Sequence, residues 1–455
     1  MDTIIISFAG LSMLLLMGKL LRTIVKPLQY LYLPAAVIGG LLGLIVIQTG
    51  LVIPHVTIPA SWIAGWVQIP GIFINIVFAA LFLGLTIPPL TEIWRYSASQ
   101  LAYGQIVAWG QYVFGIGMVL FLLEPMYGIS GIFGVIVPVG FEGGHGTAGG
   151  LMPVFADMGK PELGDYALAA ATAGILLAII SGMVLINWAV YRGHVQHLRP
   201  FNAMTKAELS GIYPIEQRPA AGFQTVSADS LDSLALHLSV IGIAILIGFL
   251  GKQYLIGLEH VISNGTTSIF KSFPLFPLCM LGGLVLQILL QRVITNPPID
   301  HQLMQRIAGT ALDFLVVAAI ATIRLEVIAK GLVPFVLIII AGTLWNIFCV
   351  VWLAPRLLKI DWFERAIAEM GQSMGVTATG LLLLRVVDPE NRSSAQAAFG
   401  YKQLLHEPFM GGGIWTSTAI ILFIHYGAWV VFTISIAAIV IWLLVWQFFI
   451  RDLAN

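Results

Sequence analysis

The run from Glu142 to Gly150, EGGHGTAGG, places a carboxylate, an imidazole and a hydroxyl among five glycines. Glu142 offers oxygens to sodium or to a substrate ammonium, and His145 can shuttle protons because imidazole titrates near neutral pH. Glycine permits positive φ and a close approach of the backbone to a ligand. Helix N-termini in such a segment would present N–H groups to an anion. The run therefore predicts a binding site for a small ion or a small polar molecule.

Each of these residues also has a simpler interpretation. Glu142 can cap or pair locally, His145 can tie two carbonyls of the segment together, and the glycines can serve close helix packing. Packing does not explain an acid and an imidazole in an apolar segment, because ionisable groups in hydrocarbon are expensive. Irregular backbone at membrane depth needs protein or a water-filled cavity around it. We therefore interpret residues 131–158 as a re-entrant hairpin with its glycine tip inside the membrane.

A second apolar segment, residues 366–388, is interrupted in the same way. It contains the run MGQSMGVTATG from Met370 to Gly380, which supplies amide, hydroxyl and glycine positions. We expect this segment to form a second hairpin, entering from the cytoplasmic side, with its tip near that of the first.

Two charged residues lie in or near the predicted helix at 308–327. Asp313 is a candidate sodium ligand, because hard cations take oxygen ligands and a carboxylate inside a span is a functional candidate. It can instead neutralise Arg306. Arg324 is a candidate partner for a substrate carboxylate. It can instead extend to the membrane surface or pair with Glu326.

Composition identifies the chain as a membrane protein. Of its 455 residues, 58% are hydrophobic and only 10% are charged, whereas soluble domains carry about 25% charged residues. The formal net charge is zero, which gives no sign of a nucleic-acid partner. The first apolar stretch lacks a basic leader and a cleavage site, so we interpret it as a retained helix. Two cysteines in apolar spans predict neither a disulfide framework nor a cysteine-based metal site.

Apolar stretches of about 20 residues, the length that crosses a bilayer, predict an all-α polytopic architecture. The predicted helices cover 3–20, 33–50, 70–87, 104–122, 166–190, 233–251, 273–291, 308–327, 332–354, 395–424 and 427–450. The predicted division is a five-helix unit at 1–190, a cytoplasmic linker at 191–232, a second five-helix unit at 233–424 and an extra helix with a short tail at 425–455.

Basic residues predict the orientation, because Lys and Arg flanking spans stay in the cytoplasm. With the N-terminus outside, seventeen of the 22 Lys and Arg residues fall in cytoplasmic segments. Only Lys160, Lys252, Lys271 and Lys330 fall outside, with Arg324 inside a span. The C-terminus is then cytoplasmic, and the membrane is the inner (plasma) membrane.

Two phrases recur in the same order in both halves. P-x4-GGL occurs at Pro34 and Pro277, an offset of 277 − 34 = 243 residues, and T-A-x-G-L occurs at Thr147 and Thr377, an offset of 377 − 147 = 230. Such recurrence indicates an internal duplication. Because each half has five helices, an odd number, the two repeats must be inverted, as in many secondary transporters.

The first hairpin run, Gly143-Gly144-His145-Gly146-Thr147, resembles the glycine-glycine-x-glycine hairpin signature of the bacterial sodium/glutamate symporter family. The second hairpin is similar to the glycine-rich, threonine-containing C-terminal hairpin of that family. The likeness extends over most of residues 1–424. It implies inverted five-helix repeats with two re-entrant hairpins, and a secondary symporter that couples sodium to the transport of glutamate.

The resulting interpretation is a carrier of glutamate or a similar small anion that works by alternating access, without a cofactor and with sodium as the coupling ion. The predicted substrate-binding residues are Gly143, Gly144, His145, Gly146, Thr147, Gln372, Ser373, Gly375, Thr377 and Arg324. The predicted sodium ligands are Asp313, Thr147, Thr377, Thr379 and Glu142. The sequence leaves the oligomeric state open, a homodimer included.

Three alternatives remain. One is a carrier of another carboxylate, including a proton-coupled one. A second is a sensor, although the linker is too short for an output domain. A third is a membrane enzyme: Gly128-Ile129-Ser130-Gly131 has the Gly-x-Ser-Gly form of rhomboid intramembrane proteases, but a serine nucleophile needs a base in reach. Neither His406 nor His425 is clearly placed to be that base.

Overall fold

The computed structural model describes residues 2–30, 33–50, 58–85, 90–195, 212–262, 270, 273–388 and 392–451. Nine helices of this part are long and apolar enough to cross a membrane. Helices suit this environment, because a chain in hydrocarbon must satisfy its backbone hydrogen bonds within each segment. The prediction of an all-α polytopic membrane protein is therefore confirmed. Arg199, Lys206 and Lys271, and residues 196–211 of the predicted linker, lie outside the described residues.

The helices of the first half are α1 (Asp2–Ile24), α2 (Lys26–Tyr30), α3 (Ala35–Gly50), α4 (Ala60–Ala80), α5 (Leu90–Met118), α6 (Glu124–Tyr127), α7 (Ile136–Gly140), α8 (Gly144–Asp157) and α9 (Glu162–Tyr191). The predicted helix at 70–87 is displaced: α4 begins ten residues earlier and contains Pro70 in its interior. Proline is tolerated inside transmembrane helices because neighbouring groups satisfy the freed carbonyl.

The helices of the second half are α11 (Ser233–Ile262), α13 (Phe276–Val293), α14 (His301–Ala321), α15 (Leu325–Lys330), α16 (Leu332–Phe348), α17 (Ala354–Leu357), α18 (Trp362–Met374), α19 (Thr377–Val387), α20 (Ala395–His406), α21 (Ile414–Tyr426) and α22 (Ala428–Val445). The predicted helix at 308–327 ends at Ala321, which leaves Arg324 in the connection before α15.

The prediction of one continuous helix at 395–424 is wrong, because the chain breaks between α20 and α21. Pro408 cannot donate a backbone hydrogen bond, and its own carbonyl accepts the N–H of Ile414 at 2.9 Å. Gly412 then adopts φ +91, a left-handed conformation that favours glycine. The proline and the glycines of this segment therefore create a third interrupted helix.

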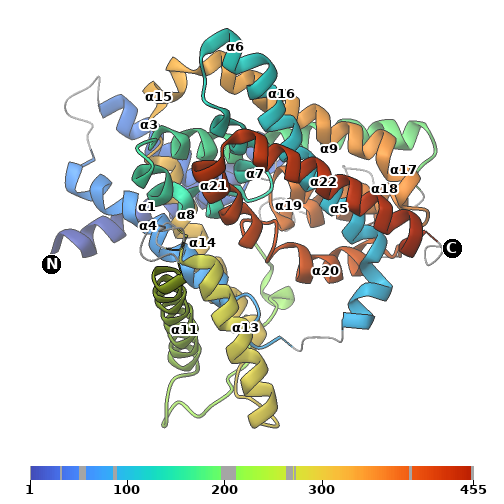
Figure 1. Ribbon diagram of the computed structural model, residues 1–455. Helices are drawn as coiled ribbons and strands as arrows, with labels where there is room; N and C mark the ends of the chain where they lie inside the picture. Colours follow the sequence, from blue (N-terminus) through green and yellow to red (C-terminus); the bar gives the residue numbers. More distant parts are fainter. Residues whose placement is uncertain are drawn as a thin grey trace.

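The helices form two bundles (Figure 1). Bundle A consists of α1, α3, α4, α11, α13 and α14, and bundle B consists of α5, α7, α8, α9, α16 and α18 to α22. The bundles contact one another mainly where α8 packs against α4 and α14. Each half of the chain contributes its first three long helices to bundle A and its later helices to bundle B.

Paired glycines set the helix crossings inside bundle A. A Cβ on Gly39 of α3 would lie 2.5 Å from a backbone oxygen of α1, and one on Gly282 of α13 would lie 2.3 Å from a backbone oxygen of α11. A Cβ on Gly40 would lie 2.6 Å from a side chain of α14, and one on Gly283 would lie 2.3 Å from a backbone oxygen of α4. The first glycine of each pair thus faces a helix of its own half, and the second faces a helix of the other half.

Candidate functional site

Three chain breaks meet in bundle B: between α7 and α8, between α18 and α19, and between α20 and α21. A Cβ on Gly144 would lie 3.5 Å from the backbone oxygen of Gly375, so the first two breaks touch. A Cβ on Gly412 would lie only 1.8 Å from the Thr147 hydroxyl oxygen, so the third break touches the start of α8. The first distance is an ordinary van der Waals contact, whereas the second leaves no room for a side chain at Gly412.

A cavity of about 340 Å³ lies between the two bundles at this meeting point. Bundle A lines it with mainly apolar side chains, such as Ile74 and Phe78 of α4, together with Asp313 of α14. Bundle B contributes the polar side of the cavity from all three breaks. The volume is within the range of about 300–1,000 Å³ that is typical of small-molecule sites.

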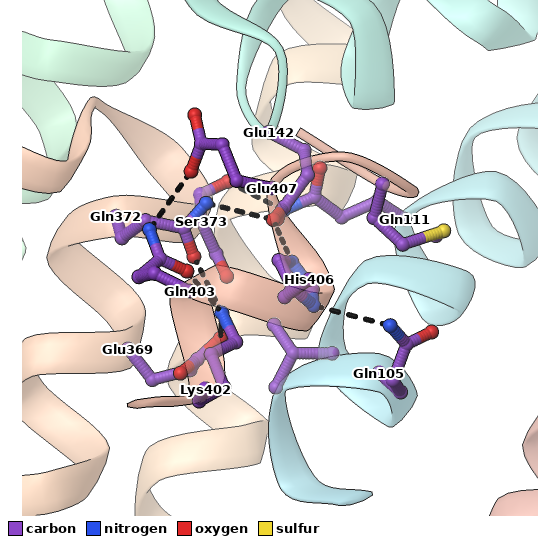
Figure 2. A network of polar contacts seen from close by, with 12 residues as sticks. Gln105, Gln111, Glu142, Glu369, Gln372, Ser373, Lys402, Gln403, His406 and Glu407 are labelled. Atoms are coloured by element: carbon purple, nitrogen blue, oxygen red, sulfur yellow. Dashed lines mark hydrogen bonds and ion pairs between the residues drawn. The ribbon is translucent and has the colours of Figure 1, made fainter. Parts of the chain in front are cut away.

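Glu142 is the central polar residue of the cavity wall (Figure 2). Its Oε1 accepts hydrogen bonds from Gln372 Nε2 at 2.8 Å and from His406 Nε2 at 2.6 Å. Its Oε2 is buried and has no hydrogen-bond partner in the described part of the chain. The Thr147 hydroxyl, also on the cavity wall, is likewise buried without a partner. Buried polar atoms are normally satisfied, so orphaned oxygens on a cavity wall point to a bound ligand, ion or water.

A fully buried ion pair supports this wall from behind. Lys402 Nζ lies 2.6 Å from Glu369 Oε1, and neither side chain is exposed. The same ammonium donates to Gln372 Oε1 at 3.1 Å, which fixes the Gln372 amide so that its Nε2 faces Glu142. Gln100 donates to the other oxygen of Glu369 at 2.8 Å and so anchors the pair to α5.

The third break adds a second polar group to the cavity wall. Gln403 Nε2 donates to Thr377 Oγ1 at 2.8 Å and to Glu407 Oε2 at 2.9 Å. Both Thr377 and Glu407 line the cavity. Sequence reasoning missed Glu407, Gln403 and Lys402 as parts of a site. Pro408 and the three glycines at 411–413 are the signal that would have indicated an interrupted helix there.

The structure brings most of the predicted site residues together. The cavity is lined by Glu142, Gly143, His145, Gly146, Thr147, Asp313, Gln372, Gly375 and Thr377. Gly144 lies directly beside the second break. Ser373 and Thr379 are buried but are not among the residues that line the cavity.

Arg324 lies apart from the cavity. Its Nε and Nη2 donate to Asp165 Oδ2 of α9 at 2.9 and 2.7 Å, and its backbone N–H donates to Oδ1 at 3.0 Å. The Arg324 side chain is 46% exposed, whereas Asp165 is buried. Arg324 thus neither lines the cavity nor pairs with Glu326. Its partner is the Asp165 carboxylate, from the other half of the chain.

His145 has a different partner from the one predicted. Its Nε2 lies 2.9 Å from the hydroxyl oxygen of Thr172 in α9, and Thr172 in turn donates to the Leu168 carbonyl at 3.0 Å. Because the single hydroxyl hydrogen is directed to Leu168, His145 Nε2 is the donor to Thr172. His145 therefore fastens the start of α8 to α9 and does not bridge carbonyls within its own segment.

The central glycines of the first two breaks differ in conformation. Gly144 has φ +64, as expected of a left-handed turn. Gly375 has φ −127, which lies outside the left-handed region. A Cβ on Gly375 would instead lie 2.9 Å from the Gly371 backbone oxygen and 2.9 Å from the Thr379 hydroxyl oxygen. Glycine at 375 is thus required by close packing.

Neither a metal cluster nor a protease-like pair is found in the described ranges. No group of three or more His, Cys, Asp or Glu side chains gathers there in a way that would hold a metal ion, so a sodium ion would also need hydroxyl or carbonyl oxygens. Ser130, the residue of the protease-like motif, is exposed. It begins a 3-10 turn, Gly131–Val135, outside the cavity.

Comparison with known proteins identifies a family. The model of the sodium/glutamate symporter family matches residues 2–389, which include the first two of the three breaks and the cavity-lining parts of α3, α4, α8 and α14. No curated protein matches the chain.

Proposed function

The chain belongs to the sodium/glutamate symporter family, and we propose that it transports glutamate together with sodium through the cavity between bundles A and B. Membership in a symporter family indicates a transporter and not an enzyme. The observation that carries the proposal is the position of the cavity. It lies where three interrupted helices of one bundle face intact helices of the other, the arrangement by which secondary transporters bind substrates.

We propose alternating access in which bundle B moves against bundle A. The contact between the bundles supports this idea, because it is made by small residues: Gly146 and Gly150 of α8 both face Ile74 of α4, with a Cβ at either position 3.1 Å from that side chain. A glycine surface has no long side chains to interlock with the opposite helix.

The paired glycines support an inverted duplication of residues 1–190 and 233–424. Gly39 and Gly282 occupy equivalent crossings in their halves, and so do Gly40 and Gly283. With five helices per half, the pairs of short helices at 131–158 and 366–388 would be re-entrant hairpins from opposite faces. In this topology the protein lies in the plasma membrane, with its N-terminus outside the cell and its C-terminus in the cytoplasm.

The proposed substrate site uses the starts of α8 and α19, whose first N–H groups have no partner within the helix and attract anions. Gly143 to Thr147, Gln372, Gly375 and Thr377 surround this position, with Ser373 behind them. Arg324 is left out of the site because Asp165 already binds its guanidinium.

The proposed sodium site draws on oxygens at the same place. Asp313 and Glu142 supply carboxylates, and Thr147 and Thr377 supply hydroxyls on the cavity wall. The orphaned oxygens of Glu142 and Thr147 support their assignment. Thr379 lies behind the wall, beside Gly375, so it would contribute only after a movement of α19.

The test is uptake of radiolabelled glutamate into proteoliposomes containing the purified protein. An inward sodium gradient is expected to drive accumulation, whereas an equal potassium gradient is not. Excess unlabelled aspartate, succinate and citrate would define the substrate class. Uptake that ignores sodium but follows an inward pH gradient would refute sodium coupling. The contact between Glu142 and His406 would then favour the second candidate, a proton-coupled carboxylate carrier.

The topology has a separate test. Single cysteines at Lys160 and Arg392 are expected to react with a membrane-impermeant thiol reagent from opposite sides of the membrane. Reaction of both from the same side would contradict inverted repeats without affecting the transport proposal.

A further inference from the structure

His406 connects the cavity wall to a hydrogen-bonded chain inside bundle B (Figure 2). It ends α20, is fully buried, and places Nε2 2.6 Å from Glu142 Oε1. On its other side, Nδ1 lies 3.3 Å from Gln105 Nε2 of α5. Gln105 Oε1 accepts the indole N–H of Trp109 at 3.0 Å. Four side chains thus form a line that ends at the carboxylate of the cavity.

The order of donors along this line determines the protonation of His406. An indole nitrogen is only a donor, so the Gln105 atom facing Trp109 is the carbonyl oxygen, and the atom facing His406 is the amide nitrogen. An amide N–H also only donates, so His406 Nδ1 must accept and carries no hydrogen. The single hydrogen of the ring is therefore on Nε2, and His406 gives Glu142 a hydrogen bond from a neutral ring.

A neutral His406 leaves the charge of Glu142 without a cation in direct contact. The other cation nearby, Lys402, lies 2.6 Å from Glu369 and reaches Glu142 only through Gln372. In the described part of the chain, the other charged groups near His406 are the carboxylates Glu369 and Glu407. A buried carboxylate is strongly destabilised unless a positive group joins it, and Glu142 Oε2 is the atom left open for one.

We propose that Trp109 and Gln105 hold His406 as the neutral Nε2-protonated ring, so that no protein cation balances the charge of the Glu142 carboxylate and its free Oε2 binds a small cation in the cavity. The cation is either the coupling sodium ion or the ammonium group of the substrate. The inference rests on the proposed function, because it takes a ligand with such a group to be the one transported. Gln105 and Trp109 are positioning residues: they act on the ligand through His406 and Glu142.

Gln105→Glu tests this directly. The substitution keeps the shape of the side chain and leaves one oxygen to accept the Trp109 N–H. The other oxygen then faces His406 Nδ1, and two facing acceptors need a hydrogen between them, which Nδ1 takes because imidazole is more basic than a carboxylate. His406 becomes an imidazolium in contact with Glu142, and its positive charge offsets the Glu142 carboxylate at the cation site. We expect cation binding to weaken at least about tenfold, which corresponds to about 1.4 kcal/mol.

Two measurements on the purified full-length protein distinguish the two cations. The first is the sodium concentration that gives half-maximal thermal stabilisation at constant ionic strength, with choline replacing sodium. The second is the competition of glutamate, and of its amino-free analogue glutarate, against labelled glutamate at saturating sodium. A shift in sodium alone assigns the site to sodium. Weaker glutamate binding with unchanged glutarate binding assigns it to the ammonium.

Gln305→Glu is the matched control, because Gln305 is an exposed glutamine of α14 that does not line the cavity. It adds the same charge away from His406 and is expected to leave both measurements unchanged. Wild-type values for Gln105→Glu in both measurements would overturn the proposal while the transport function stands. A wild-type protein that responds to neither sodium nor glutamate would overturn the proposed function, and this inference with it.

A second pair of variants covers the case in which Gln105→Glu does not fold. His406→Gln offers Glu142 a neutral N–H that cannot ionise, whereas His406→Lys places an ammonium at the same position. We expect His406→Lys to weaken cation binding at least about tenfold more than His406→Gln. Equal losses in the two variants would mean that the charge at position 406 is irrelevant to the site.

Discussion

Gly412→Ala is expected to impair transport by forcing apart the broken helix α20–α21 and the start of α8. A Cβ at this position would lie 1.8 Å from the Thr147 hydroxyl oxygen, whereas real Cβ atoms essentially never come closer than 3.0 Å to such an atom. The clash is relieved only by a displacement: either the Thr147 side chain rotates away, or the two segments separate by up to 3.0 − 1.8 = 1.2 Å. Thr147 lines the cavity, so this displacement changes the site itself.

The energetic cost has two parts. Holding a residue other than glycine at φ +91 costs about 1–3 kcal/mol, and overpacking a filled interior costs about 1–3 kcal/mol more. The sum, about 2–6 kcal/mol, is comparable with the stability of about 5–15 kcal/mol of folded proteins. We therefore expect a protein that still folds but melts at a lower temperature, with sodium-driven glutamate uptake reduced at least about tenfold.

The assay is uptake per reconstituted molecule, together with thermal unfolding in detergent. Gly400→Ala is the matched control, because Gly400 lies within α20 and a Cβ there would meet nothing within 4 Å. That variant should transport normally and gain up to about 1 kcal/mol from helix propensity. The double variant Gly412→Ala with Thr147→Ala removes the clashing hydroxyl and should recover part of the lost melting temperature. Wild-type melting and uptake in Gly412→Ala would refute the reasoning.

Further predictions concern the sodium site, the Arg324 pair and the helix crossings. Asp313→Asn should raise the sodium concentration for half-maximal uptake more than tenfold, which corresponds to over about 1.4 kcal/mol. Thr377→Val should raise it less, because it removes only a neutral oxygen. Unchanged sodium dependence in Asp313→Asn would exclude the Asp313 carboxylate from the sodium site. Arg324→Ala should lower the free energy of unfolding by about 1–3 kcal/mol, since it leaves Asp165 buried without its charged donor. The KM for glutamate should not change. A tenfold rise in KM without loss of melting temperature would instead place Arg324 in the substrate site. Gly282→Val should destabilise the protein by about 1–3 kcal/mol or more through overpacking against α11, and an unchanged melting temperature would contradict the close crossing.

Local chemistry alone was enough to predict several features of this protein. Apolar stretches of bilayer length predicted an all-helical membrane protein, because each such segment satisfies its own backbone hydrogen bonds. Glycines and polar residues at membrane depth located the first two chain breaks, and Glu142, Gln372 and Thr377 were assigned to the site from the same cost of burying polar groups. All three line the cavity.

Partners from distant segments could be known only from the tertiary structure. Glu142 meets His406 across 264 residues of chain, and Arg324 meets Asp165 across 159. No local pattern marks such a pairing, since a buried charge specifies only that it needs a partner and not which one. Pro408 and the glycines at 411–413 indicate a possible break, yet transmembrane helices tolerate both residue types, and only the tertiary structure shows that this break packs against α8. The sequence thus determined which groups must be satisfied, and the fold decided which groups satisfy them.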